Sequence, residues 1–332
     1  MVQECGKTIA VLFTDLADCD SEIPFPNKMA NKSNSIFSKK ADEAGLKILF
    51  ARYVEYQNGK LKRAWIKQKN KWHIINDQKI DLVYSRFARA MFLNNKENQE
   101  VISFKFDMVK ELNAINHPII DKFCWDKRIV SEIFPEYTPR TFVINTFKGL
   151  MAVLPEIKTE RIVFKPQFGT LGEKVIITDR NSLPKLIEKN TIVQEFIDTS
   201  KGIDGIIKGY HDLRLIMING KIDHAHVRIP KKGTLTANVA LGGKKIFIKN
   251  EKIPKKAIQI AKKVDKLFKS YKPRIYSIDF LIDENQRPYI VECNSQPVID
   301  RYAYGKYADL SFYDRILKIM KAGIKIKVVE TI

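Results

Sequence analysis

Near the C-terminal end of the chain, two apolar segments hold polar side chains where a buried strand would carry none. The segments Ser277–Ile282 (SIDFLI) and Tyr289–Asn294 (YIVECN) flank the polar turn Asp283–Arg287. Two short apolar runs around such a turn predict a β-hairpin. Asp279 and Glu292 lie within these runs, and a carboxylate in a buried strand is costly unless it is paired or bound to a metal. The hairpin therefore constrains both the fold and the chemistry.

Three oxygen-bearing side chains of this hairpin can meet. Glu292 and Asn294 differ by two positions and so share one face of their strand, and Asp279 can lie opposite that face. Oxygen donors suit Mg²⁺, which combines carboxylates with substrate phosphates and water. The alternative is an exposed hairpin whose polar residues face solvent. Cys293 points to the other face, where we expect it to pack in the core.

Strand-like and helix-like segments alternate through the first hundred or so residues. This alternation predicts a small parallel-sheet domain, and shorter strands after Asp121 predict a mixed sheet. The expected fold class is α/β (α+β). Expected helices cover Lys28–Ala44, Lys127–Ile133, Ser182–Lys189, Pro254–Lys269 and Phe312–Met320. Expected strands cover 8–14, 46–53, 80–85, 140–144, 161–165, 174–178, 191–196, 212–218, 221–227, 244–248, 275–282 and 289–293, and 60–75 is rich in β-forming residues.

Composition excludes several protein classes. The hydrophobic fraction of 45% over 332 residues is ordinary for a globular protein, and no apolar run approaches the roughly 18 residues of a membrane helix. The four cysteines lack a paired C-x-x-C spacing, which argues against a disulfide framework or a structural zinc site. We therefore expect a cytoplasmic protein with no signal peptide and no membrane partner.

The formal net charge of +20 favours anionic partners without choosing among them. The alternative is a solvated, lysine-rich surface with no specific partner. The chain has no block of five like charges, and we predict no basic amphipathic helix. Zinc-finger and RNA-recognition signatures are also absent from the sequence. We therefore do not expect a nucleic-acid partner.

A lysine and a glycine-containing loop follow one another in Val163–Val175 (VFKPQFGTLGEKV). Gly169 and Gly172 would let backbone amides approach phosphate oxygens, and Lys165 supplies a positive charge. The segment matches neither the Walker A nor the dinucleotide-binding pattern, and glycine-containing turns between strands are common. Further on, Ile192–Ile197 (IVQEFI) either offers groups to a nucleotide or is an ordinary buried strand.

Six segments in a fixed order carry a resemblance to a known family. They are Asp126-Lys127, KPQFGTLGEKV, VQEFI, HDLRLIMINGK, VRIPKKGTLTANVALGGK and SIDFLIDENQRPYIVECNSQP. In this order they resemble the ATP-grasp superfamily, most closely the branch of bacterial glutathione synthetase and the ligases that add glutamate to a ribosomal protein tail. The resemblance covers about residues 121–300. It implies an ATP-grasp fold with a pre-ATP-grasp domain (1–120), a lid subdomain (121–198) and a C-terminal subdomain with the metal site (199–332).

The resemblance also implies roles for individual residues. ATP would be bound by Lys127, Lys165, Gln194, Glu195, Phe196, Ile197, Asp212 and Arg214, beneath a loop with Gly169, Thr170 and Gly172. Catalysis would involve Lys165, Arg228 and Asn238. Two Mg²⁺ ions, with Mn²⁺ as the alternative, would be bound by Asp279, Glu292 and Asn294. Substrate would contact Arg86, Thr236 and Gly243. Thr236 stands where the family usually has an arginine, so the identity of the substrate stays open.

The implied activity is that of an ATP-dependent carboxylate–amine ligase. Such an enzyme forms an amide or peptide bond through an acylphosphate and releases ADP and phosphate. Its partners would be small-molecule or peptide carboxylates and amines, and the basic charge favours acidic ones. One alternative is a non-catalytic, nucleotide-binding ATP-grasp protein of the kind associated with spore coats, and another is a nucleic-acid-binding protein. The sequence leaves the oligomeric state open, a homo-oligomer included.

Overall fold

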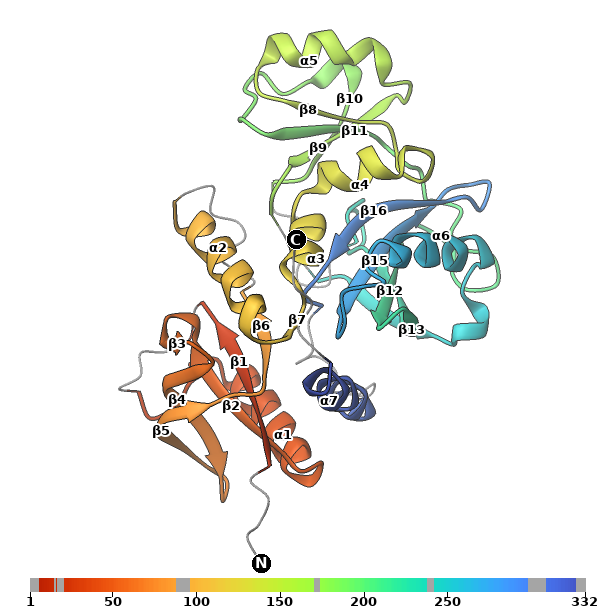
Figure 1. The fold of residues 1–332 in the computed structure, drawn as a ribbon. Helices are drawn as coiled ribbons and strands as arrows, with labels where there is room; N and C mark the ends of the chain where they lie inside the picture. Colours follow the sequence, from red (N-terminus) through yellow and green to blue (C-terminus); the bar gives the residue numbers. More distant parts are fainter. Residues whose placement is uncertain are drawn as a thin grey trace, which may run out of the picture. The chain divides into compact units, whose positions relative to one another are not determined.

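In the computed structural model the chain forms two compact units, whose elements are labelled in Figure 1. Unit 1 is drawn from Met1–Pro118, Ser270–Ile275 and Gln296–Ile332, and unit 2 from Ile119–Lys269 and Tyr276–Ser295. The structure describes residues 6–14, 16, 21–87, 96–169, 174–237, 242–297 and 309–326.

The predicted subdomain boundaries at residues 120 and 198 stay a prediction beside these two units. The predicted lid and C-terminal subdomains group into one unit, and the end of the chain groups with unit 1. The physical reason lies in helix α7 (Ser311–Ile324), which packs on α1 (Lys28–Glu43). The rings of Phe37 and Tyr313 join the two helices with centroids 5.4 Å apart. Both side chains are almost fully buried.

A parallel sheet forms the centre of unit 1. Strand β1 (Lys7–Phe13) lies between β2 (Leu46–Arg52) and β6 (Leu82–Arg86), and runs parallel to both. The two-residue strand β7 (Ala114–Ile115) extends the sheet beyond β6, again in parallel. Most of β1 is buried, as expected for a parallel strand covered on both faces. The predicted N-terminal parallel-sheet domain is therefore confirmed.

Antiparallel strands extend this sheet on its other side. They are β3 (Tyr56–Gln57), β4 (Lys60–Gln68) and β5 (Lys71–Lys79), in the order β3-β4-β2 with β5 also paired to β4. The predicted turn at Asn58-Gly59 is confirmed, with φ of 48° and 72°. A second tight turn at Lys69-Asn70, with φ of 45° and 64°, carries no glycine and was not predicted.

The helices of unit 1 agree in part with the sequence. The predicted helix Lys28–Ala44 is confirmed as α1, which begins where the Asn27 side chain accepts hydrogen bonds from the backbone N–H groups of Met29 and Ala30. Such a cap satisfies donors that the first turn leaves unpaired. Helix α2 (Lys96–Glu111) was not predicted.

Unit 2 contains two separate sheets. The first has the order β10-β9-β11-β8, with every neighbouring pair antiparallel. Helix α5 (Phe147–Val153) packs on it, and Leu150 shares a buried apolar cluster with Phe164 and Val193. The strands of this four-stranded sheet are β8 (Thr141–Ile144), β9 (Arg161–Pro166), β10 (Ile176–Asp179) and β11 (Thr191–Glu195). The helices before it are α3 (Pro118–Trp125) and α4 (Lys127–Ile133), the second as predicted.

The helix predicted over Ser182–Lys189 is wrong. A single 3₁₀ turn covers Arg180–Ser182, and Leu183 is extended with φ −63° and ψ 144°. Leu183 precedes Pro184, and the proline ring disfavours helical geometry for the residue before it. The apolar spacing of this segment therefore did not produce a helix.

The second sheet of unit 2 has five strands in the order β14-β13-β12-β15-β16. Its strands are β12 (Asp212–Ile218), β13 (Lys221–Ile229), β14 (Lys244–Ile248), β15 (Ile275–Ile282) and β16 (Pro288–Asn294). All five predicted strands are confirmed, and β15 pairs with β16 in the expected antiparallel hairpin. This five-stranded sheet carries the candidate site.

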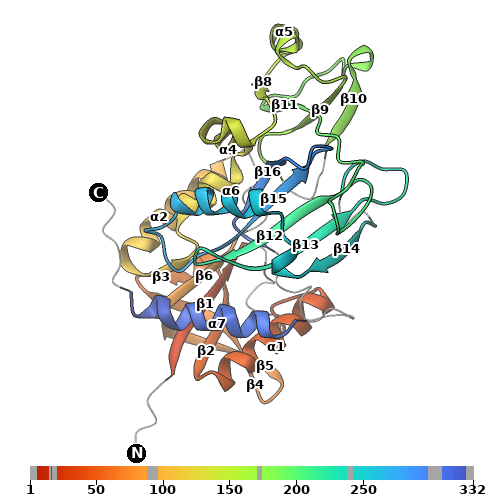
Figure 2. The same ribbon diagram turned by 90° about the vertical axis from the view of Figure 1, so that its right-hand side faces the viewer.

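Helix α6 (Lys255–Lys266) lies beside β15 in both views (Figures 1 and 2). Its buried side is formed by Ala257, Ile260, Ala261 and Val264, while the lysines of the helix are exposed. The prediction that the chain has no basic amphipathic helix is therefore wrong. The lysines are split into pairs by apolar residues, which hides their common face in the linear sequence. No helix within the described ranges is long and apolar enough to cross a membrane.

Candidate active site

Charged side chains line one face of the five-stranded sheet. Asp279 of β15 lies directly opposite Glu292 of β16, and Asp212 of β12 lies opposite Arg228 of β13. Directly opposed residues of an antiparallel pair project from the same face. Arg214 follows Asp212 by two positions and shares its face. We call these five residues, which come from four adjacent strands, the charged row.

Asp279 is the centre of the charged row. Its carboxylate accepts hydrogen bonds from Arg214 Nε at 2.6 Å, Arg214 Nη2 at 2.5 Å and Arg228 Nη2 at 2.6 Å. The residue is only 2% exposed. Burial alone would raise its pKa, but the two guanidinium groups hold the pKa of Asp279 below its ordinary value. Asp279 is therefore ionised at neutral pH.

Arg228 is shared between two carboxylates. Besides Asp279 it binds Asp212, to which Nε donates at 2.6 Å and Nη2 donates as well. Burial opposes its charge, yet Asp212 and Asp279 keep the pKa of Arg228 above its ordinary value. Burial raises the pKa of Asp212, and the nearby Asp279 carboxylate acts in the same direction against Arg228. The two-pronged contact with Asp212 and the single hydrogen bond to Asp279 fix the plane of the guanidinium.

Two lysines lie near the Glu292 end of this row: Lys165 of β9, which is buried, and Lys127 of α4, which is half-buried. Lys165 Nζ donates to Gln194 Oε1 at 2.9 Å and lies 3.5 Å from the carbonyl oxygen of Val291, next to Glu292. Burial and the charge of Lys127 together lower the pKa of Lys165 to about 8, against the opposing effect of Glu292. The charge of Glu292 also acts on Lys127 and Arg228. Three cations therefore interact electrostatically with this carboxylate.

Lys127 is held in place by contacts between α4 and the end of β9. Its Nζ donates to the carbonyl oxygen of Gly169 at 2.7 Å, and its backbone N–H donates to that of Gln167 at 3.3 Å. The Gln167 side chain in turn donates to Asp126 Oδ1 at 2.8 Å. Asp126 also caps α4 by accepting from the N–H of Arg128. Sequence reasoning missed the role of Asp126, although an aspartate before a helix is a common capping signal.

The predicted metal ligands offer a suitable set of donors. Asp279, Glu292 and Asn294 lie on one face of the hairpin, because Asn294 follows Glu292 by two positions. Within the described part of the chain, no group of three or more His, Cys, Asp and Glu residues gathers as a complete metal site. Two carboxylates and an amide oxygen fit a hard divalent cation that completes its shell with phosphate oxygens and water. The donor set thus fits a metal that arrives with a phosphate.

A comparison with protein-family models identifies the family of this chain. The model of a RimK-like ATP-grasp domain matches residues 135–318, which is more than half of the chain. The chain belongs to the RimK-like ATP-grasp family. The predicted superfamily and branch are therefore confirmed. Membership in this family implies the use of ATP and of a divalent metal.

Named relatives of this RimK-like ATP-grasp protein are bacterial. A protein of Legionella pneumophila (strain Corby), named probable alpha-L-glutamate ligase, is 31% identical over 146 residues, which are 42% of this chain and 43% of that protein. A Vibrio parahaemolyticus protein of the same name is 26% identical over 192 residues, covering 55% of this chain and 59% of that protein. The matched region spans less than two thirds of either relative.

Solved structures agree with the fold of the RimK-like protein. A RiPP-associated ATP-grasp ligase of Chryseobacterium gregarium, in complex with ADP and a leader and core peptide, has a TM-score of 0.62 at 14% identity and covers 97% of this chain and 100% of that chain. D-alanine–D-alanine ligase from Bacillus anthracis, complexed with ATP, has a TM-score of 0.62 at 13% identity, with coverage of 96% and 97%. The predicted ATP-grasp fold class is therefore confirmed.

The predicted adenine segment follows β11 of this ATP-grasp domain. Glu195 Oε1 accepts a hydrogen bond from the backbone N–H of Lys158 at 2.8 Å. The N–H of Phe196 donates to Thr159 Oγ1 at 3.2 Å, and the guanidinium of Arg161 lies 5.6 Å from the centre of the Phe196 ring. Glu195 is thus engaged with the protein backbone. The nucleotide roles of Gln194, Glu195, Phe196 and Ile197 remain predictions.

The remaining predicted site residues lie outside the charged row or outside the residues that the structure describes. Thr170, Gly172 and Asn238 lie outside the described residues. Thr236 and Gly243 flank residues 238–241 in the segment between β13 and β14. Arg86 belongs to unit 1, where its Nη1 donates to Tyr84 Oη at 3.2 Å and to the carbonyl oxygen of Pro297 at 3.3 Å.

His226 of β13 is a residue that sequence reasoning missed. It pairs with Arg214 on one side and Phe247 on the other, so it shares the face of the charged row. It is 3% exposed, and its Nδ1 has no hydrogen-bond partner within the described structure. Burial, Lys245 and the two arginines of the row all lower its pKa, so the imidazole is neutral. The alternating pattern His224-x-His226 was the available signal.

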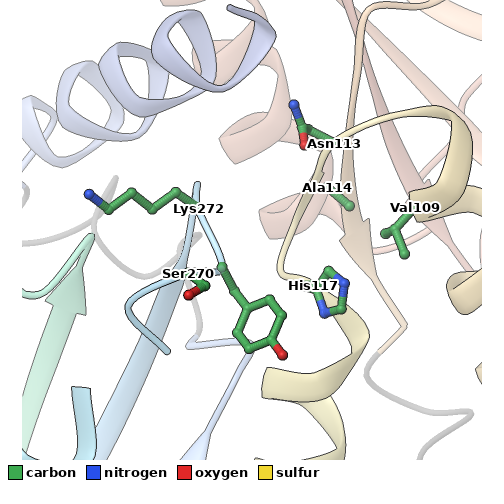
Figure 3. Close-up of a pocket in the computed structure, with 7 residues that line it drawn as sticks. Val109, Asn113, Ala114, His117, Ser270 and Lys272 are labelled. Carbon is green, nitrogen blue, oxygen red and sulfur yellow. The ribbon is translucent and has the colours of Figure 1, made fainter. Parts of the chain in front are cut away.

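A small recess in unit 1 contains none of the predicted site residues (Figure 3). The stacked rings of His117 and Tyr271, 4.4 Å apart, lie at this recess. Burial lowers the pKa of His117 to about 4, with a further effect of Lys105, so the imidazole is neutral. The other residues lining it are Val109, Asn113, Ala114, Ser270 and Lys272. The charged row, and not this recess, is therefore the candidate active site.

Proposed function

We propose that the protein is an ATP-dependent carboxylate–amine ligase that forms an amide or peptide bond and releases ADP and phosphate. The observation that carries the proposal is the placement of Lys165 Nζ 3.5 Å from the carbonyl oxygen next to Glu292, and of Arg228 on Asp279, which lies opposite Glu292. Cations around a metal-binding carboxylate suit a triphosphate that arrives with Mg²⁺. The names of the relatives support the same activity.

Each residue of the site has a physical task in this proposal. Phosphoryl transfer to a carboxylate needs positioning and charge neutralisation more than covalent help. Lys127 and Lys165 hold phosphate oxygens, and their burial strengthens the attraction because little water screens it. Asp279, Glu292 and Asn294 would hold two Mg²⁺ ions, and the chemistry that such ions supply is neutralisation of the charge on the transferred phosphoryl group.

Arg228 serves the second half of the reaction. The amine attacks the acyl carbon of the acylphosphate, and negative charge develops on the carbonyl oxygen before phosphate leaves. Asp212 and Asp279 hold the guanidinium in a fixed plane. A donor fixed before the reaction stabilises this oxyanion without reorganising. An acylphosphate intermediate has to be kept from water, which would otherwise hydrolyse it.

The substrates follow from the relatives and from charge. The Legionella and Vibrio relatives are named glutamate ligases, so we propose glutamate as the amine substrate. The structurally similar ligase of Chryseobacterium was solved with a leader and core peptide, which supports a peptide as the carboxylate substrate. The net charge of +20 favours an acidic peptide. We place the reaction in the cytoplasm, where ATP and Mg²⁺ are supplied.

The test is release of ADP with Mg²⁺, ATP, glutamate and pools of acidic peptides. The proposal predicts that at least one pool stimulates ADP release and that Glu292→Ala abolishes the stimulation. Glu284→Ala is the matched control, because Glu284 sits in the turn of the same hairpin and is largely exposed. ATP binding without stimulation by any amino acid or peptide would instead support the non-catalytic alternative.

A further inference from the structure

Helix α6 presents a continuous face of lysines to solvent. Lys255, Lys256, Lys262 and Lys266 are all exposed. At 100° per residue these four positions fall within an arc of about 120° on the helix surface. We call them the α6 lysine face. Lys263 falls in the same arc but is engaged, because its Nζ contacts the hydroxyl and the ring of Tyr137.

The charge of this face has little compensation nearby. The segment 249–269 contains eight lysines and two acidic residues. One of the two, Asp265, accepts a hydrogen bond from Tyr276 Oη at 2.9 Å. Among the ion pairs of the described residues, none involves a member of the α6 lysine face. Four ammonium groups are thus available to an anion.

The α6 lysine face lies on the opposite side of the sheet from the charged row. The ring of Phe268, just after α6, contacts that of Tyr276 on β15 with centroids 5.2 Å apart. Tyr276 precedes Asp279 by three positions, so the two side chains point to opposite faces of the strand. The lysines project from the outer side of a helix that covers the Tyr276 face. They therefore form a surface separate from the candidate active site.

We propose that the α6 lysine face binds an acidic peptide segment. The apolar side of α6 is buried against the protein, and Leu267, 42% exposed just after the helix, offers too little apolar surface to insert into a lipid bilayer. The segment 249–269 has no arginine, and its one aromatic residue, Phe268, is 1% exposed. The segment therefore lacks the forked guanidinium contacts and exposed rings that favour recognition of nucleic-acid bases. Flexible ammonium groups bind carboxylates as point charges and require no fixed geometry.

The dimensions define the length of the partner. From Lys255 to Lys266 the helix rises about 17 Å, which matches about five residues of an extended peptide. A segment with several carboxylates in such a stretch can contact all four lysines. A peptide segment held on the α6 lysine face would have a higher effective concentration at the surface of the protein. The inference goes beyond the proposed ligase activity and does not depend on it.

Binding of a fluorescein-labelled oligoglutamate peptide of about six residues, measured by fluorescence anisotropy without nucleotide, tests this inference. The variant carries Lys255→Gln, Lys256→Gln, Lys262→Gln and Lys266→Gln. The matched control carries Lys28→Gln, Lys32→Gln, Lys39→Gln and Lys62→Gln, four exposed lysines of unit 1, and so has the same net charge. Circular dichroism melting verifies that both are folded.

The expected result is a Kd at least about tenfold weaker for the α6 variant and within about twofold of wild type for the control. The wild-type Kd should also weaken between about 50 mM and about 200 mM salt, because ions screen exposed charges. Equal losses in both variants would show that net charge alone binds the peptide and would overturn the inference. Tighter binding of an RNA oligonucleotide of equal charge, with the same dependence on α6, would overturn the choice of partner.

Discussion

The two faces of the five-stranded sheet treat positive charge in opposite ways. On the charged row, Arg214 and Arg228 are buried and bonded to Asp212 and Asp279. On the other face, the lysines of α6 project into solvent. The ion pairs of the charged row fix the guanidinium groups in space, whereas the ammonium groups of the α6 lysine face have no such partners among the described residues to fix them.

This difference teaches what each kind of charge can do. Burying an ion pair costs desolvation free energy that only good geometry repays, so such a pair contributes precise placement more than stability. Exposed charges are screened within about 8–10 Å at physiological salt and contribute little to folding. The charged row therefore suits chemistry on a bound substrate, while the α6 lysine face suits attraction of a flexible anion.

Asp279→Ala should produce the largest effect. It leaves Arg214 and Arg228 buried with fewer acceptors, and breaking a buried ion pair costs about 3–5 kcal/mol. Urea unfolding followed by circular dichroism measures the change in the free energy of unfolding. Glu284→Ala, at an exposed position of the same hairpin, should change it by less than about 0.5 kcal/mol. Equal small effects of both substitutions would remove the contrast between the two faces.

Arg228→Lys should mainly affect catalysis. A lysine keeps the charge but cannot make the two-pronged contact with Asp212, so its ammonium is not fixed in the plane of the guanidinium. We expect kcat of ADP release to fall by about 10²–10³, the usual cost of losing an oxyanion donor. The KM for ATP should change little. An unchanged kcat would mean that the fixed plane of Arg228 has no role in the reaction.

The buried Lys165 should make both nucleotide binding and stability depend on pH. Its pKa of about 8 lies below the ordinary value of 10.5, so ATP affinity should fall as pH rises through 8. The folded state loses this proton near pH 8 and the unfolded chain near 10.5, so the unfolded state binds more protons in between. The free energy of unfolding should therefore rise with pH over that interval.

Lys165→Met isolates this effect. Binding titrations and urea unfolding between pH 7 and pH 10 should show a shallower dependence on pH for the variant, in both measurements. The control is Lys185→Met, at an exposed position of the same unit, which should keep the wild-type profile. Identical pH profiles for wild type and Lys165→Met would contradict the assignment of this pH dependence to Lys165.

Lys262→Gln should produce the smallest effect. The side chain is exposed and makes no ion pair with another described residue, so the free energy of unfolding should change by less than about 0.5 kcal/mol. Thermal unfolding at low and high salt measures it. A destabilisation above 1 kcal/mol would mean that the α6 lysine face contributes to folding, contrary to the comparison above.

Much of the fold could be predicted because local patterns agreed with tertiary structure. The hairpin of β15 and β16, helix α4 and strands β12 and β14 follow from apolar runs bounded by polar turns. The wrong helix at Ser182–Lys189 followed from apolar spacing alone, since the extended conformation before Pro184 prevailed. The packing of α7 on α1 joins residues far apart in sequence, which no local pattern reports.

The candidate site was predictable in its residue types but not in its contacts. The spacing of Glu292 and Asn294 placed both on one face, and the register confirms Asp279 opposite Glu292. The sharing of Arg228 between Asp212 and Asp279 could not be predicted, because it depends on the order of β13, β12 and β15 across the sheet. His226 was overlooked because histidines in a strand resemble ordinary packing, even though the strand carries the pair His224 and His226.

The central claim is that the Glu292 end of the charged row binds a triphosphate together with Mg²⁺. Isothermal titration of ATP into wild type, Glu292→Gln and the control Glu284→Gln, with and without Mg²⁺, tests it most directly. The account predicts that Mg²⁺ strengthens ATP binding at least about tenfold in wild type and in the control, but not in Glu292→Gln. The same dependence on Mg²⁺ in all three proteins would contradict it.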